Sequence, residues 1–180
     1  MEYIILTGPK NSGKTSAAKV FSKLYAYNFL DLDELISQGT GESPRQLYNK
    51  GQDIFQAAEA DALAALFKLN KNNPKRRRQF VMAAGGGIID NEKAISLIKE
   101  NSHIIVYLDV PADIAWNRII SSSNGELPPF LQSGNPQETH RILHERRAVA
   151  YLQLANIIIK AGGKTPEEIA VEIFANLKNF

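Results

Sequence analysis

The residues whose chemistry is clearest lie near the start of the chain. Residues 8–15 are Gly-Pro-Lys-Asn-Ser-Gly-Lys-Thr, which fits the pattern G-x-x-x-x-G-K-[ST] of a phosphate-binding loop. Glycines at both ends let consecutive backbone N–H groups point inward at an anion. Lys14 brings positive charge to the outer phosphates, and the Thr15 hydroxyl is placed to bind Mg²⁺. We predict a nucleotide site built by Gly8, Asn11, Ser12, Gly13, Lys14, Thr15 and Ser16.

The elements on either side of this loop have the types that the motif requires. Residues 3–7 are β-branched, aromatic and apolar, which is typical of a buried strand. Residues 16–25 have helical spacing, and the positive end of that helix adds to anion binding. This context disfavours the alternative, a glycine-bearing turn with an incidental Gly-Lys-Thr. The predicted apolar side of the helix consists of Ala17, Val20, Phe21 and Leu24.

Two further groups of residues follow predicted strands. A short strand over residues 28–30 ends at Asp31-Leu32-Asp33, and a strand over residues 80–84 ends at Gly85-Gly86-Gly87. Ligands of open α/β sheets bind beyond the carboxyl ends of the strands, so both groups are candidates for a site. Glycines there allow close approach of a ligand to the backbone. The alternatives are that one aspartate only caps the next helix, and that the glycines form a tight turn.

Composition limits the class of protein. The chain of 180 residues has 44% hydrophobic residues, which suits one globular domain. Its net charge of +2 is too small to suggest a general polyanion binder. The absence of cysteine excludes disulfides and thiolate chemistry. No apolar run approaches a membrane span, and the immediate first strand leaves no room for a signal peptide, so we expect a cytoplasmic protein. We interpret the basic run 74–78 as a solvated turn rather than a nucleic-acid patch.

Five strands alternate with helices along the chain, which predicts a three-layer α/β/α fold with a five-stranded parallel sheet. We expect a single domain with a core of residues 1–33, 78–120 and 138–180. A helical, substrate-binding insertion would span residues 34–62, with Ser43 capping one helix and Phe55, Ala58, Ala62, Leu66 and Leu69 on the packed side of the next. Residues 121–137 have no periodicity and are predicted to form a lid.

Taken together, these residues resemble the shikimate kinase family, in the nucleoside-monophosphate-kinase-like branch of P-loop proteins. The resemblance extends over nearly the whole chain and implies the strand order 2-3-1-4-5. It also implies ATP-dependent phosphorylation of a small hydroxylated acid, with shikimate converted to shikimate 3-phosphate. The segments that carry it are residues 8–15, Asp31-Leu32-Asp33, Phe55 with Glu59, residues 84–87, and residues 147–151 followed by Ala155.

The resemblance also implies roles for individual residues. Asp31 would join Thr15 in holding Mg²⁺, and Arg118 would lie beside the adenine. Lys14 and Asp33 would be catalytic, because Lys14 neutralises phosphate charge and Asp33 binds the substrate hydroxyl and can accept its proton. The substrate would be bound by Asp33, Gln56, the backbone amides of Gly85, Gly86 and Gly87, and Arg147.

Two positions depart from the family pattern. Gln56 stands where the family has one of two arginines that clamp the substrate carboxylate. Leu127 stands at the position of a lid arginine, and no arginine lies between Arg118 and Arg141. Loss of a charged partner typically weakens carboxylate binding by about 1.5–3 kcal/mol. We hypothesise that Arg45 or Lys50 supplies the charge in place of Gln56.

These departures leave two further functions open. One is a kinase for another hydroxylated metabolite, and the other is a catalytically weak, nucleotide-binding regulatory protein. For the kinase, we expect Mg²⁺ as cofactor, ATP as co-substrate and a small hydroxylated acid as partner. We expect a monomer that binds neither nucleic acid nor membranes.

Overall fold

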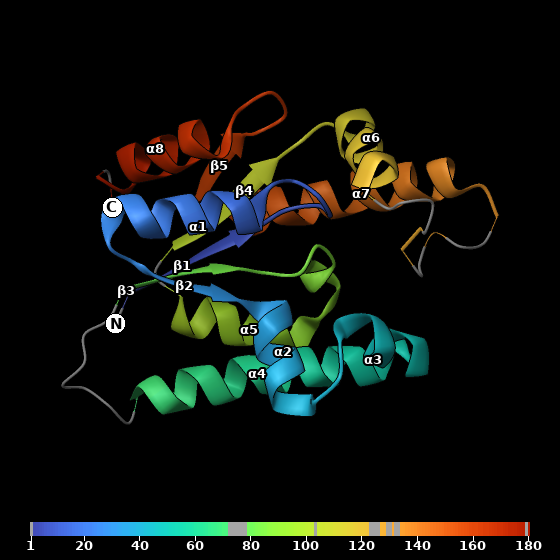
Figure 1. The fold of residues 1–180 in the computed structure, drawn as a ribbon, viewed down its shortest axis with the longest axis horizontal. Helices are drawn as coiled ribbons and strands as arrows, with labels where there is room; N and C mark the ends of the chain where they lie inside the picture. Colours follow the sequence, from blue (N-terminus) through green and yellow to red (C-terminus); the bar gives the residue numbers. More distant parts are fainter. Residues whose placement is uncertain are drawn as a thin grey trace.

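Five strands form one all-parallel sheet in the order β2-β3-β1-β4-β5 (Figure 1). The computed structural model describes residues 2–71, 79–102, 104–122, 127–128, 131, 134–178 and 180. The predicted fold class and strand order are confirmed. The strands are β1 (Glu2–Thr7), β2 (Asn28–Asp31), β3 (Gln79–Ala83), β4 (Ile104–Asp109) and β5 (Ile157–Lys160).

Alternating side chains of the strands build two apolar cores, one on each face of the sheet. Ile4 and Leu6 of β1 belong to the core under α1 (Lys14–Tyr25) and α8 (Pro166–Leu177). Tyr3 and Ile5 point to the other core, under α4 (Gln52–Lys71) and α5 (Glu92–Asn101). This two-residue period is the property of a pleated strand buried on both faces. Figure 1 shows α1 and α8 on one side of the sheet and α4 and α5 on the other.

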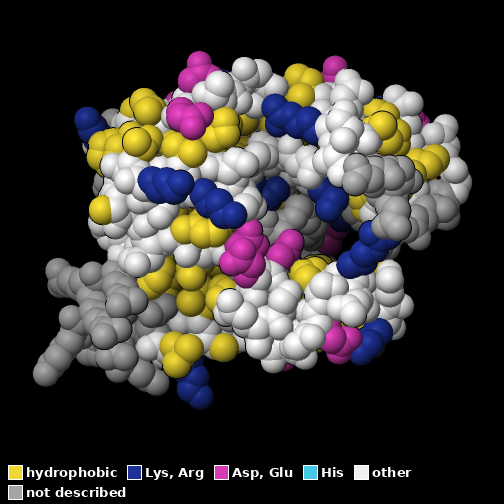
Figure 2. Space-filling view, in the orientation of Figure 1, with side chains coloured by type: hydrophobic (Ala, Val, Ile, Leu, Met, Phe, Trp, Pro, Cys, Tyr) yellow, Lys and Arg dark blue, Asp and Glu magenta, His cyan; other side chains and the backbone are white. Residues whose placement is uncertain are grey.

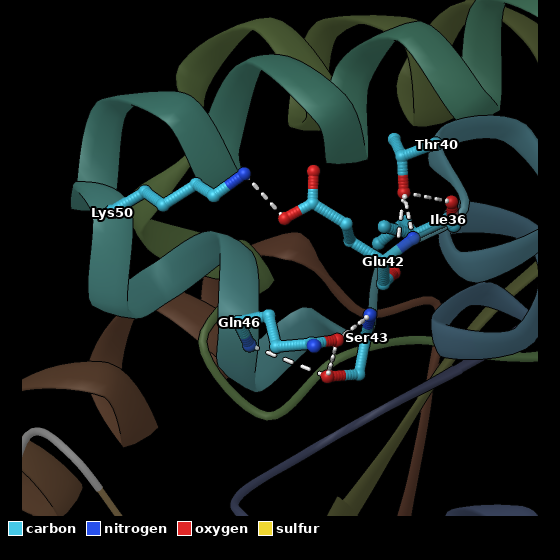
Figure 3. Close-up of polar contacts among 6 residues, drawn as sticks. All are labelled: Ile36, Thr40, Glu42, Ser43, Gln46 and Lys50. Carbon is cyan, nitrogen blue, oxygen red and sulfur yellow. Dashed lines mark hydrogen bonds and ion pairs between the residues drawn. The ribbon is translucent and has the colours of Figure 1, made fainter.

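The first two helices between β2 and β3 begin at well-defined caps. Leu32–Thr40 form α2, and Pro44–Lys50 form α3, whose N-terminus is closed by a capping box between Ser43 and Gln46 (Figure 3). The predicted cap at Ser43 is therefore confirmed. The following helix, α4, buries Ala60, Leu63 and Phe67, whereas Leu69 is 70% exposed. The predicted apolar stripe of α4 is thus wrong at its end.

Three more elements complete the described fold: the short 3₁₀ helix η1 (Ile88–Asp90), α6 (Ala112–Ser122) and α7 (Pro136–Leu154). The basic run 74–78 lies outside the described residues, as do residues 123–126, 129–130 and 132–133 of the predicted lid. The ends of the predicted lid belong to α6 and α7. Within the described part of the chain, no helix combines the length and the apolar character that crossing a membrane requires.

Candidate active site

The phosphate-binding loop connects β1 to α1 and has the backbone that the motif predicts. Asn11 and Gly13 adopt positive φ values of 59° and 94°. Gly8 has φ 142°, and a methyl group added to it would lie 2.7 Å from the Leu108 carbonyl oxygen. The first turn of α1 follows Gly13 and has no side-chain cap. Its N–H groups are therefore available for an anion, as at other helix N-termini that bind phosphate.

Lys14 is folded into this loop. Its Nζ donates hydrogen bonds to the carbonyl oxygens of Gly8 (3.0 Å) and Pro9 (2.7 Å) and to Ser12 Oγ (3.2 Å). Burial lowers the pKa of Lys14 to about 8, against the opposing effect of the Asp33 charge. The ammonium group is thus solvated by loop oxygens, and an anion bound in the loop would favour its charged form.

A cavity of about 670 Å³ opens beside the loop. Arg118 of α6 reaches its wall and donates to the carbonyl oxygens of Gly162 (3.1 Å) and Asn11 (3.3 Å). The Asn11 side chain in turn donates to the Arg118 carbonyl oxygen (3.2 Å) and to Ser122 Oγ (2.8 Å). These reciprocal bonds fix α6 against the loop. The predicted nucleotide residues on the cavity wall are Asn11, Gly13, Lys14, Thr15, Ser16 and Arg118.

The Thr15 hydroxyl donates to Asp31 Oδ2 at 3.1 Å, at the edge where β2 meets α1. Asp31 Oδ1 also accepts from the Asp33 amide (3.0 Å), so Asp31 caps α2 and faces the loop as well. A hydroxyl and a carboxylate are hard oxygen donors of the kind Mg²⁺ prefers, with its other ligands from phosphate and water. No group of three or more His, Asp or Glu side chains suited to a metal occurs among the described residues. The oxygen atoms of the Thr15–Asp31 pair fit Mg²⁺ by their chemistry.

A second cavity, of about 850 Å³, lies on the other side of the loop. Figure 2 shows a hollow in this face with Lys and Arg side chains on one wall and Asp and Glu on another. The cavity is bounded by the start of α2, by α3 and α4, by the turn after β3, and by α7. It brings together all the residues predicted to bind substrate: Asp33, Gln56, Gly85, Gly86, Gly87 and Arg147.

None of the three glycines after β3 has a positive φ, so their effect lies in the close approach of neighbouring groups. A methyl group at Gly86 would lie 2.8 Å from Lys10 N and 3.0 Å from Lys10 Cα. At Gly87 it would lie 3.3 Å from Arg147 Nη2, and at Gly85 it would lie 3.1 Å from Glu59 Oε1. The glycines therefore let the phosphate loop, an arginine and a buried glutamate converge on one turn.

Two carboxyl groups with raised pKa values face this turn. Burial, followed by the charge of Asp31, raises the pKa of Asp33, while Lys10 and Lys14 act in the opposite direction. Glu59 of α4 is 1% exposed, and burial raises its pKa to about 7. Its Oε2 accepts a hydrogen bond from Asn91 Nδ2 (2.9 Å), but its Oε1 has no partner among the described residues. An orphaned buried oxygen of this kind is costly unless a proton or a ligand satisfies it.

Sequence reasoning missed the ion pairs of Asp90. Arg147 Nε and Nη2 lie 2.9 and 2.7 Å from Asp90 Oδ2, and Arg146 Nη2 lies 2.8 Å from Oδ1. The Gln56 side chain donates to the Asp90 carbonyl oxygen at 3.1 Å. No local pattern signals these contacts, because Asp90 and Arg147 are 57 residues apart. Arg147, which we expected to bind the carboxylate of a substrate, is thus already paired with the carboxylate of Asp90.

The two cations proposed to replace the missing arginine have different surroundings. Arg45 lines the second cavity. Lys50 is not among the residues that line it, and its Nζ pairs with Glu42 Oε2 at 2.5 Å (Figure 3). Arg45 is therefore the residue to which we assign this hypothesis.

Comparisons with known proteins agree with this geometry. The model of the shikimate kinase family matches residues 10–178. A shikimate kinase of Marinomonas sp. is 30% identical over 176 residues, covering 97% of this chain and 91% of the relative. One of Caldanaerobacter subterraneus subsp. tengcongensis is 32% identical over 174 residues, covering 96% and 94%.

A solved structure of a shikimate kinase is also similar to this chain. The shikimate kinase of Acinetobacter baumannii in complex with shikimate superposes with a TM-score of 0.84 at 27% identity. The alignment covers 99% of this chain and 94% of that one. Since both the family model and the relatives cover nearly the whole chain, the protein belongs to the shikimate kinase family, a family of small-molecule kinases.

Proposed function

We propose that the protein transfers the γ-phosphoryl group of ATP to a hydroxyl group of shikimate and releases ADP and shikimate 3-phosphate. The observation that carries this proposal is that the two cavities adjoin at the phosphate loop, because Asn11 of the loop and Ser122 of α6 line both of them. The γ-phosphate of ATP in the first cavity would then lie next to a hydroxyl group of the substrate in the second. Phosphoryl transfer needs this positioning and charge neutralisation more than it needs covalent chemistry.

In this proposal each residue has a definite task. Lys14 leaves its loop oxygens to meet the outer phosphates, and Asp33 orients the attacking hydroxyl and takes up its proton. Arg147 binds the substrate carboxylate with the help of the glycine amides. Thr15 and Asp31 would hold Mg²⁺, which supplies charge neutralisation to the phosphates when bound. We place this reaction in the cytoplasm, where ATP and Mg²⁺ are abundant, and assign it to a monomer with residues 121–137 as a lid.

A second candidate is a kinase for a neutral or differently charged polyol. It is favoured by the contact of Arg147 with Asp90 and by the uncharged Gln56 beside them. A substrate without a carboxylate would not need to compete with Asp90 for Arg147.

An ADP-coupled assay with a panel of acceptors tests both proposals. The panel contains shikimate, its neutral methyl ester and simple polyols, each with Mg·ATP. Turnover of shikimate that is lost in Asp33→Asn supports the first proposal. Turnover of the ester or a polyol in preference to shikimate supports the second. Tight Mg·ATP binding without any phosphorylated product contradicts both and indicates a regulatory nucleotide-binding protein.

A further inference from the structure

Lys10 occupies the place where the phosphate loop meets the substrate cavity. It is the third residue of the loop, its backbone lies against Gly86, and its side chain is exposed. Lys10 lines the second cavity together with Asp33, whereas Lys14 lines the nucleotide cavity. The two lysines therefore flank the point at which a phosphoryl group would pass from one cavity to the other.

Three other cations of the site are already held by protein atoms. Lys14 is bound by loop oxygens, Arg118 by two backbone carbonyls and Arg147 by Asp90. Lys10, in contrast, forms no hydrogen bond or ion pair with any residue in the described ranges. Its charge acts on both neighbours, since it lowers the pKa values of Lys14 and Asp33. Lys10 is thus a cation close to both sides of the reaction and available to a ligand.

The segment that follows α6 cannot supply such a charge. Residues 119–140, which include the predicted lid, contain neither lysine nor arginine. A positive charge that neutralises the transferring group from the substrate side must therefore come from the loop, from α7 or from Arg45 of α3. Arg147 of α7, which lines the cavity, is paired with Asp90 and is assigned above to the substrate carboxylate.

We propose that Lys10 is a catalytic residue whose ammonium group contacts the γ-phosphoryl group during transfer. The proposal rests on the function proposed above. In that step a bond forms between the acceptor oxygen and the γ-phosphorus, and the bond from the γ-phosphorus to the bridging oxygen of ADP breaks. The hydroxyl proton goes to Asp33. Negative charge spreads over the three equatorial oxygens, and a cation placed there stabilises the transition state more than the bound substrates.

The test is steady-state kinetics of Lys10→Met and Lys10→Arg beside the wild-type protein. We expect Lys10→Met to lower kcat on the order of 10²-fold, the usual effect of removing one charge-stabilising donor. The KM for shikimate and the Kd for Mg·ATP should change by less than about threefold, because the contact forms mainly in the transition state. Lys10→Arg should recover most of kcat. The exposed Lys19→Met on α1 is the matched control and should leave kcat unchanged.

A second readout separates catalysis from structure. ADP with aluminium fluoride and shikimate mimics the transferring group, and we expect Lys10→Met to bind this combination on the order of 10²-fold more weakly while its affinity for ADP alone is retained. The proposal is overturned if kcat of Lys10→Met stays within threefold of wild type, or if the whole loss appears in the Kd for Mg·ATP. A wild-type protein that phosphorylates no acceptor overturns the proposed function as well, whereas equal turnover by wild type and Lys10→Met overturns only the role of Lys10.

Discussion

Replacement of Glu59 by Gln should change the free energy of unfolding, relative to wild type, more favourably at pH 8 than at pH 5. Glu59 is 1% exposed and has one unpartnered oxygen, so its charged form is unfavourable in the folded protein. Its pKa rises from 4.5 to about 7 on folding. Between these values the folded protein holds more protons than the unfolded chain, so wild-type stability falls as the pH rises and the loss is complete above about pH 7.

The size of this stability change follows from the shift in the pKa of Glu59. Each unit of pKa difference corresponds to about 1.4 kcal/mol, and integration from pH 5 to pH 8 gives a loss of about 2–3 kcal/mol for wild type. Glutamine keeps an oxygen for the Asn91 hydrogen bond but carries no charge. The stability difference between Glu59→Gln and wild type should therefore increase in favour of the variant by about 2–3 kcal/mol from pH 5 to pH 8.

Urea unfolding at the two pH values measures this difference directly. Glu34→Gln on the exposed side of α2 is the control and should shift by less than about 0.5 kcal/mol at either pH. A Glu59→Gln stability difference that is the same at pH 5 and pH 8 would refute the reasoning, because it would mean that Glu59 does not gain a proton on folding.

Three further predictions concern the loop, the glycine turn and α7. Nucleotide affinity should fall as the pH rises through about 8, by up to about tenfold per pH unit, because deprotonated Lys14 offers no charge to phosphate. Calorimetric titration with nucleotide from pH 7 to pH 9.5 measures this. An affinity that stays constant over that range would contradict the titration of Lys14. Gly86→Ala should destabilise the protein by about 1–3 kcal/mol and weaken nucleotide binding, since its methyl group would meet the Lys10 backbone at 2.8 Å. Gly163→Ala, whose methyl group would have no atom within 4 Å, is the control. Equal melting curves for the two variants would contradict the packing described for Gly86. Arg147→Met should raise the KM for shikimate by roughly ten- to a hundredfold and leave the Kd for Mg·ATP unchanged; an unaltered KM would show that another group binds the carboxylate.

The parts of this molecule that could be predicted from sequence are those encoded by contiguous residues. The phosphate loop is a run of eight residues whose backbone shape and flanking elements follow from their types. The cap at Ser43 is equally local, and it forms a capping box with Gln46. Periodicity was less informative about which side of a helix is buried, since Leu24 and Leu69 are 54% and 70% exposed.

Contacts between distant residues were beyond sequence reasoning. The pairing of Asp90 with Arg147 depends on how η1 and α7 meet. The unpartnered oxygen of Glu59 depends on what packs around α4, and no residue type or spacing reports that. The strand order came from the resemblance to a family, because alternation of strands and helices alone permits several orders.

The central claim is that a nucleotide in one cavity passes its terminal phosphoryl group to an alcohol in the other. Phosphorus NMR of the protein with Mg·ATP and shikimate tests it most directly. We predict a phosphomonoester resonance that grows in equal amount with ADP and is absent when Lys14 is replaced by Met. Release of inorganic phosphate in place of the ester, or an unchanged ATP spectrum, would contradict the claim.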